Sequence, residues 1–129
     1  MRVIKYREAI SEALREEMIR DKTVFVMGED VGPFGGVFQA TATLYETFGP
    51  SRVLDTPISE AAIVGAALGS ALAGLRPVAE IMFVDFTSIA MDQIANQCAK
   101  VHFMTGGQAI APLVIRTQGG AMACPPVIK

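Results

Sequence analysis

Four short β-branched and aromatic runs alternate with helix-forming segments along this chain, and that alternation limits the fold more than any other feature. Strands are expected at residues 23–27, 52–55, 77–82 and 112–117; helices are expected over Tyr6–Arg20, over residues 41–48, from Glu60 onward, and over a long segment whose apolar stripe is Phe86, Ala90, Ile94, Cys98 and Val101. Strand and helix alternation of this kind implies right-handed crossovers and a mostly parallel sheet. We therefore expect an α/β fold of three layers, with helices on both faces of the sheet.

Three loops that follow expected strands mark the place where a ligand would bind. Residues 28–36 contain four glycines and a proline, so this loop must turn sharply or approach another group closely. Residues 55–60 and 82–86 follow the second and third strands. Because ligands bind at the carboxyl ends of parallel strands, we expect the three loops to gather around one site.

Glu60 is the acidic residue that this pattern brings forward. It begins a helix whose next fifteen residues, 61–75, carry no charge, and Ser59 stands where a serine hydroxyl can cap that helix. A carboxyl in this position is expected to be buried. On chemistry alone, an acidic residue in a first helical turn is most often there to complement the helix dipole, and both interpretations stay open at this point.

Composition indicates a single domain that assembles with another chain. The 129 residues suffice for one core, and 51% of them are hydrophobic while only 19% are charged, so some apolar surface is expected to face a partner. The net charge is −2 and no basic run stands out, which argues against nucleic acid and anionic membranes as partners.

Targeting signals are not evident in the sequence. Residues 1–20 alternate charged and apolar side chains, unlike a secretory signal, and residues 61–75 are shorter than the roughly 20 residues that a bilayer span requires. Those residues are expected to form a buried helix of a soluble protein. Cys98 and Cys124 show no disulfide framework or metal spacing. We expect a reducing, cytoplasmic location.

Several spaced motifs resemble one enzyme family. They run from about residue 4 to residue 120 and comprise residues 28–32, 35–38, 55–60 with the Ala/Gly-rich helix, 76–80, 83–86, Asp92 with Gln93, and 112–116. Together they are similar to the beta subunit of thiamine diphosphate-dependent 2-oxoacid dehydrogenases. That family includes the pyruvate, branched-chain 2-oxoacid and acetoin dehydrogenases. The resemblance implies a transketolase-like pyrimidine-binding domain over residues 1–120.

The resemblance assigns roles to three residues. The carboxyl that matches Glu60 hydrogen-bonds a ring nitrogen of the cofactor's aminopyrimidine, where a shared proton favours the tautomer that deprotonates the thiazolium carbon. Glu60 would be the catalytic residue, and for this role it must hold a proton near neutral pH. Phe86 matches the aromatic that stacks on the pyrimidine, with a plain core aromatic as its alternative. Ile58 matches a position whose backbone carbonyl faces the aminopyrimidine; at Ile89 the chain departs from relatives with a polar cofactor contact.

The same resemblance implies partners. Thiamine diphosphate would be shared with an alpha subunit that holds the diphosphate and magnesium, and we expect no metal site in this chain, since residues 28–30 are not the magnesium motif. A second beta subunit, giving a heterotetramer, and the acyltransferase core of the complex are further expected partners. The small-residue face of residues 65–69, with Ala61, Ala62 and Ala73, is expected at a subunit interface, with packing inside the chain as the alternative. His102 is expected to be solvated and non-catalytic.

The match ends after residue 120. Residues 121–129 form a divergent tail, and the C-terminal transketolase-type domain that such subunits carry is absent from this sequence. We therefore expect the beta-subunit portion of an oxidoreductase that acts on a 2-oxoacid such as pyruvate, or cleaves acetoin, and we expect the isolated chain to be inactive. The alternative is a non-catalytic interaction domain that keeps the subunit interface.

Overall fold

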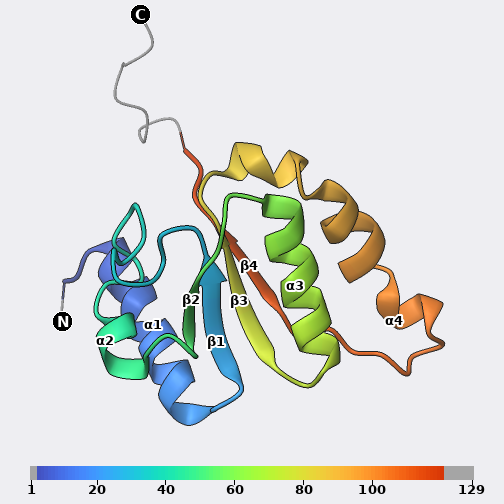
Figure 1. The fold of residues 1–129 in the computed structure, drawn as a ribbon, viewed down its shortest axis with the longest axis horizontal. Coiled ribbons are helices and arrows are strands. Elements are labelled where there is room, and N and C mark those ends of the chain that lie inside the picture. Colours follow the sequence, from blue (N-terminus) through green and yellow to red (C-terminus); the bar gives the residue numbers. More distant parts are fainter. Residues whose placement is uncertain (1–2, 121–129) are drawn as a thin grey trace, which may run out of the picture.

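The four expected strands form one sheet in the computed structural model, which describes residues 3–120. They are β1 (Val24–Gly28), β2 (Val53–Asp55), β3 (Arg76–Ile81) and β4 (Val114–Thr117). The strands lie in the order β2-β1-β3-β4, and all three pairings are parallel (Figure 1). The predicted α/β class is confirmed.

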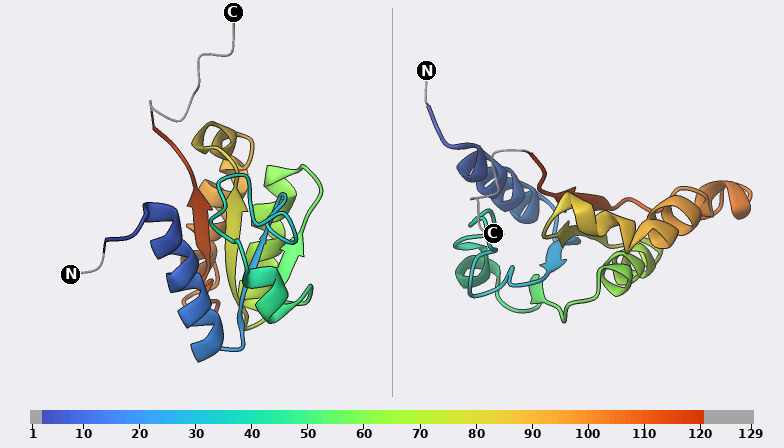
Figure 2. Two further views of the ribbon diagram at one scale, coloured as in Figure 1. Left: turned by 90° about the vertical axis from the view of Figure 1, so that its left-hand side faces the viewer. Right: turned by 90° about the horizontal axis from the view of Figure 1, so that it is seen from above.

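Helices cover both faces of this sheet, as expected. Helices α1 (Tyr6–Arg20) and α2 (Leu44–Phe48) lie on one side, and α3 (Glu60–Leu72), η2 (Asp92–Cys98) and α4 (Val101–Met104) lie on the other (Figure 2, right). Alternate strand residues point to opposite faces. Val26 and Val78 accordingly pack toward α1, whereas Met27 and Ala79 pack toward α3.

Strand β1 is buried along its whole length, because it is paired on both edges and covered on both faces. Its last residue, Gly28, is in register with Asp55 of β2 and with Glu80 of β3. A side chain at Gly28 would lie 2.7 Å from the backbone oxygen of Glu80. The glycine therefore permits the close approach of β1 and β3 at the end of the sheet where the loops gather.

The segment expected to be one long helix is instead divided into three. A 3-10 turn, η1 (Val84–Ser88), is followed by the π-helix η2 and the short helix α4. The hydroxyls of Thr87 and Ser88 donate to the backbone carbonyls of Val84 and Asp85, and such bonds compete with the regular helical pattern. The expected single stripe is wrong at its ends, since only Ala90, Ile94 and Cys98 join the core against α3.

Two further expectations need correction. Helix α2 begins at Leu44 rather than residue 41, because Thr43 has a left-handed backbone (φ 70°) that cannot continue a helix from before it. Helix α3 is not buried all round. One face packs on the sheet, while Ala62, Ala66 and Gly69 are exposed.

A buried ion pair joins β3 to β4 beneath the glycine-rich loop. The Arg116 guanidinium lies 2.6 Å from a carboxyl oxygen of Glu80, its neighbour in register, and both side chains are largely buried. Burial raises the pKa of Glu80 above its ordinary value, and the positive charge of Arg116 opposes that rise. The ion pair therefore offsets part of the free-energy cost of burying a charged carboxyl.

We predict that Arg116→Met lowers the free energy of unfolding by about 3 kcal/mol at pH 8, because it leaves a buried carboxylate without its cation. In the variant the pKa of Glu80 in the folded state rises further above the unfolded value, so stability falls as the pH rises through that interval. Urea unfolding at pH 5 and pH 8 measures this. The deficit should shrink at pH 5.

Arg7→Met is the matched control, because Arg7 lies on the exposed surface of α1. It should leave the free energy of unfolding within about 0.5 kcal/mol of the native value. An equal deficit for Arg116→Met at both pH values would contradict the assigned cause.

Candidate functional site

The segment between β2 and α3 places Glu60 at the carboxyl end of the sheet. The Thr56 amide donates to the Gly28 carbonyl at 2.9 Å, which ties this segment to the end of β1. Helix α3 begins at Glu60, as predicted, and the Ile63 amide donates to the Ser59 carbonyl. The predicted side-chain cap is wrong, because the Ser59 hydroxyl makes no capping bond.

Glu60 is a buried carboxyl without a hydrogen-bonding partner. Its side chain is only 7% exposed, as the sequence predicted. Within residues 3–120 no hydrogen bond or ion pair engages its carboxyl group. The Glu60 oxygens are not among the fully enclosed unpaired atoms, so they remain accessible to a ligand. Thr56 Oγ1, four residues earlier, is fully buried without a hydrogen bond in the described part of the chain, and buried polar groups are nearly always paired.

The glycine-rich loop that follows β1 is held by internal hydrogen bonds. The Gly36 amide donates to the Asp30 carbonyl at 2.8 Å, and the buried Thr41 hydroxyl donates to the Val31 carbonyl at 2.8 Å. Gly35 and Gly36 have φ of 82° and 79°, values that favour glycine. The loop is therefore a defined structure that brings Glu29 beside the start of α3.

Glu29 is a further candidate site residue, which the sequence analysis missed. Partial burial raises the pKa of its carboxyl, and the neighbouring carboxyl of Glu60 and that of Asp30 raise it further. Carboxyls with raised proton affinity cluster at functional sites. The available signal was its position directly after a buried strand, in a loop already identified as a ligand-binding candidate.

The other two predicted site residues lie at the same end of the sheet. Phe86 lies in η1, which follows β3 and sits over the end of the sheet where α3 starts (Figure 1). Its ring packs edge-on against Phe83, with centroids 5.7 Å apart, and stays 38% exposed. Ile58 precedes Glu60 by two residues and projects an exposed side chain, and Ile89 is exposed as well.

These residues fit a flat heteroaromatic ligand with ring nitrogens. A buried carboxyl without a partner can hydrogen-bond a ring nitrogen, and a partly exposed aromatic face can stack on the ring. The buried Thr56 hydroxyl supplies one more polar atom without a protein partner. The set suits the aminopyrimidine of thiamine diphosphate, although its diphosphate would need groups from elsewhere.

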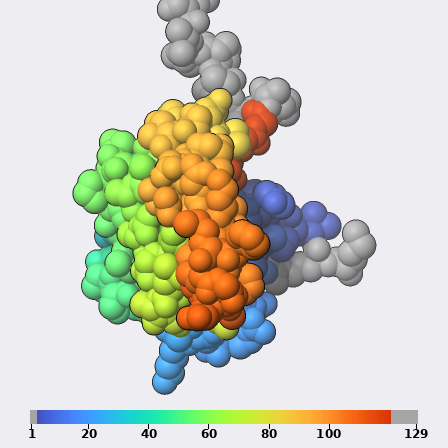
Figure 3. Space-filling model, turned by 90° about the vertical axis from the view of Figure 1, so that its right-hand side faces the viewer, coloured from blue at the N-terminus to red at the C-terminus, as the bar shows by residue number. Residues whose placement is uncertain are grey.

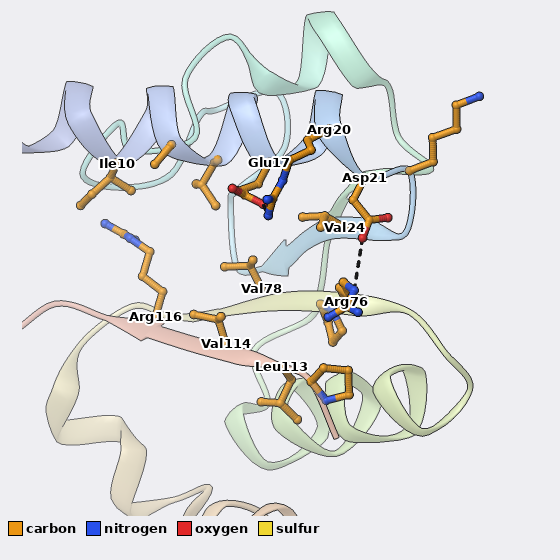
Figure 4. Close-up of a pocket in the computed structure, with 15 residues that line it drawn as sticks. Ile10, Glu17, Arg20, Asp21, Val24, Arg76, Val78, Leu113, Val114 and Arg116 are labelled. Atoms are coloured by element: carbon orange, nitrogen blue, oxygen red, sulfur yellow. Dashed lines mark hydrogen bonds and ion pairs between the residues drawn. The ribbon is translucent and has the colours of Figure 1, made fainter. Parts of the chain in front are cut away.

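A large groove in the described chain lies away from this site. It is a groove of about 1060 Å³ on the α1 side of the sheet, between α1 and the strands β3 and β4. Figure 4 shows Ile10 and Arg116 at one end and, at the other, the ion pair between Asp21 and Arg76 at 3.2 Å. Its floor includes the apolar side chains of Val78 and Val114. None of the predicted site residues lines it.

The small-residue face of α3 has two parts. At Gly65 an added side chain would lie 3.4 Å from Gln93 of η2, so this part packs inside the chain. Figure 3 shows the two segments, green and orange, side by side. A side chain added at Gly69 would meet no atom of the described residues within 4 Å, and Ala62, Ala66 and Ala73 are exposed. Packing inside the chain is therefore confirmed for Gly65, and a subunit interface stays a prediction for the exposed residues.

Other features of the described chain play no part in the site. His102 is exposed, and its Nδ1 lies 2.9 Å from the Ala109 carbonyl oxygen. No three His, Cys, Asp or Glu side chains among residues 3–120 are grouped as a metal ion would require. In the same residues, no helix has both the length and the apolar character needed to cross a bilayer.

Comparison with known proteins gives a consistent result. The family model described as "Transketolase, pyrimidine binding domain" matches residues 2–122. The chain is 52% identical over 118 residues to the pyruvate dehydrogenase E1 component subunit beta of Rickettsia bellii, covering 92% of this chain and 36% of that protein. It is 49% identical over 120 residues to the 2-oxoisovalerate dehydrogenase subunit beta of Bacillus subtilis, covering 93% of this chain and 37% of that protein.

A third relative differs in its reaction. The acetoin:2,6-dichlorophenolindophenol oxidoreductase subunit beta of Cupriavidus necator is 46% identical over 130 residues, covering 93% of this chain and 38% of that protein. The chain thus spans little more than a third of the length of these relatives. The matched region contains every predicted site residue. By sequence and by fold, the chain belongs to the transketolase pyrimidine-binding domain family.

Proposed function

We propose that this chain is the pyrimidine-binding portion of the beta subunit of a thiamine diphosphate-dependent 2-oxoacid dehydrogenase, with Glu60 as its catalytic residue. One observation carries the proposal. The Glu60 carboxyl is buried at the carboxyl end of a parallel sheet, yet it has no hydrogen-bonding partner among the described residues. The similarity to three beta subunits supports the same conclusion.

In this proposal Glu60 shares a proton with a ring nitrogen of the cofactor. Its carboxyl would hydrogen-bond a ring nitrogen of the aminopyrimidine and share a proton with it. Because the carboxyl makes no hydrogen bond within residues 3–120, this bond would not compete with a protein donor among those residues. When bound, thiamine diphosphate supplies the electron sink for decarboxylation.

Phe86 and Ile58 orient the aminopyrimidine. The exposed part of the Phe86 ring offers a flat surface for stacking, and the edge-on contact with Phe83 fixes its tilt. The backbone carbonyl of Ile58 accepts from the exocyclic amine, a role that any side chain at this position permits. Together with Glu60 they bind one ring system and leave the diphosphate outside the chain.

The proposal includes partners. An alpha subunit provides the groups that hold the diphosphate and the magnesium ion. The exposed small residues of α3 suit a second beta subunit, because small side chains let helices approach closely. The acyltransferase core of the complex would be a further partner, in a cytoplasmic compartment.

The substrate class is a 2-oxoacid such as pyruvate, or acetoin. The three relatives act, by their names, on pyruvate, 2-oxoisovalerate and acetoin, at similar identities to this chain. A site that binds the cofactor would serve each of these reactions alike. The choice among the substrates therefore belongs to groups outside the predicted site.

We predict that Glu60→Gln lowers kcat at least a hundredfold, because glutamine keeps the shape but cannot share a proton. The assay combines the chain with an alpha subunit, thiamine diphosphate and magnesium, and follows 2-oxoacid decarboxylation. A chimera that carries residues 3–120 in place of the matching part of the Rickettsia bellii subunit provides the rest of a full-length chain. Glu46→Gln, on exposed α2, is the control and should retain full activity. Equal activity of both variants would refute the role of Glu60.

Phe86→Ala should weaken cofactor binding about tenfold, the loss expected when one aromatic stacking contact is removed. Isothermal titration of the assembled chimera with thiamine diphosphate and magnesium measures the effect. Phe103→Ala is the matched control, because Phe103 is 89% exposed on α4 and far along the chain from the site. Loss of affinity in both variants alike would mean that Phe86 acts only through general packing.

A non-catalytic interaction domain is the second candidate, and the exposed face of α3 is the observation that favours it. This alternative predicts a stable oligomer whose mass by analytical ultracentrifugation is independent of thiamine diphosphate and unaffected by Glu60→Gln. The leading proposal predicts instead that the cofactor strengthens association with the alpha subunit, and that Glu60→Gln reduces this effect.

A further inference from the structure

Two loops at the carboxyl end of the sheet are joined by a hydrogen bond from the backbone of one to a side chain of the other. The Gly32 amide, in the loop after β1, donates to a carboxylate oxygen of Asp55, the last residue of β2, at 2.6 Å. The Thr56 amide donates to the Gly28 carbonyl at 2.9 Å. The loop residues between these two attachment points, Gly28 and Gly32, include Glu29.

The contact at Gly32 leaves no room for a side chain. A carbon atom added there would lie 2.6 Å from Asp55 Oδ2 and 2.9 Å from Asp55 Cγ. Distances below 3.0 Å require a group to move. The loop backbone therefore packs directly against the Asp55 carboxylate. The small glycine leaves space for the carboxylate, and its amide donates to the negatively charged oxygen.

We infer that Asp55 is a positioning residue: through the Gly32 amide, its carboxylate fixes the distance between Glu29 in one loop and Glu60 at the start of the next helix. Asp55 is connected to both groups, because it binds the loop that carries Glu29 and only four residues, including Pro57, separate it from Glu60. Pro57 has a fixed φ and restricts that connection further. This inference rests on the proposed function, to which it adds a residue that touches neither cofactor nor substrate.

The pKa of Glu29 depends on the distance between the Glu29 and Glu60 carboxyls. The pKa of Glu29 is raised by burial first, then by Glu60 and then by Asp30. Other charged groups at this end of the sheet include Asp55 itself, Asp85 of η1, and Glu80, which is paired with Arg116 below Gly36. If the loop moves away from Glu60, Glu29 gains water and loses a negative neighbour, so its pKa falls toward the ordinary value.

The test measures the Glu29 pKa by NMR titration of the 129-residue chain without cofactor, in two variants that remove the same charge. Asp55→Asn keeps an oxygen that can accept from the Gly32 amide, whereas Asp55→Ala does not. We expect a larger downward shift for Asp55→Ala than for Asp55→Asn. Exchange of the Gly32 amide hydrogen should speed up at least tenfold in the alanine variant alone.

Gly32→Ala disturbs the same hydrogen bond by changing the donor residue, and it retains the Asp55 charge. The added methyl must displace the carboxylate, so the pKa of Glu29 should again fall, and this variant decides the matter if Asp55→Ala does not fold. Glu46→Ala, on exposed α2, should change neither the pKa of Glu29 nor the exchange of Gly32. Equal shifts in both Asp55 variants, or no shift in Gly32→Ala, would overturn the inference.

Activity gives a separate readout. In the chimera assembled with the alpha subunit, thiamine diphosphate and magnesium, Asp55→Ala should lower kcat about tenfold while KM for the 2-oxoacid changes less than twofold, because the catalytic carboxyl is misplaced and substrate contacts are kept. Asp55→Asn should restore most of kcat. Unchanged kcat in Asp55→Ala would overturn the positioning role, whereas a fully active Glu60→Gln would overturn the proposed function and leave the NMR result standing.

Discussion

Pairing of β1 with β2 on one edge and with β3 on the other determines where every group of the site lies. From β1 the chain turns toward α2 and β2, and from β2 it crosses by α3 to the far edge of β1, where β3 begins. Loops that leave neighbouring strands in opposite directions open a crevice between them. Glu29 and Phe86 follow β1 and β3, and Glu60 reaches the same end of the sheet from β2.

The sheet and its layers could be predicted from sequence because each strand is a short apolar run bounded by Gly or Pro. The break in the helix after β3 could not. Its apolar spacing at Ala90, Ile94 and Cys98 suits a regular helix, but hydroxyl bonds from Thr87 and Ser88 and packing against α3 impose different turns. The missing Ser59 cap has a similar origin: the residue type was right for a cap, yet its backbone (φ −170°, ψ 89°) and side chain are placed by the tertiary structure.

For the site, sequence identified the buried acid and the glycine-rich loop but not their relation. The burial of Glu60 followed from the uncharged helix behind it. The raised pKa of Glu29 depends on how close a carboxyl 31 residues away lies in space, and no local pattern encodes that distance. The Asp55 contact is equally long-range, because it joins residues 23 apart in the chain. Family resemblance supplied roles for single residues, whereas the structure supplied the interactions between them.

The groove beside α1 lies along β4, one of the two edge strands of the sheet in residues 3–120. The free edge of that strand carries backbone donors and acceptors without a strand partner, and Val114 beside it is 56% exposed. Such an edge can add an extended strand from any polypeptide, including another copy of the same chain. Concentration, more than temperature, is then the variable that decides whether molecules of this kind remain dispersed or join edge to edge.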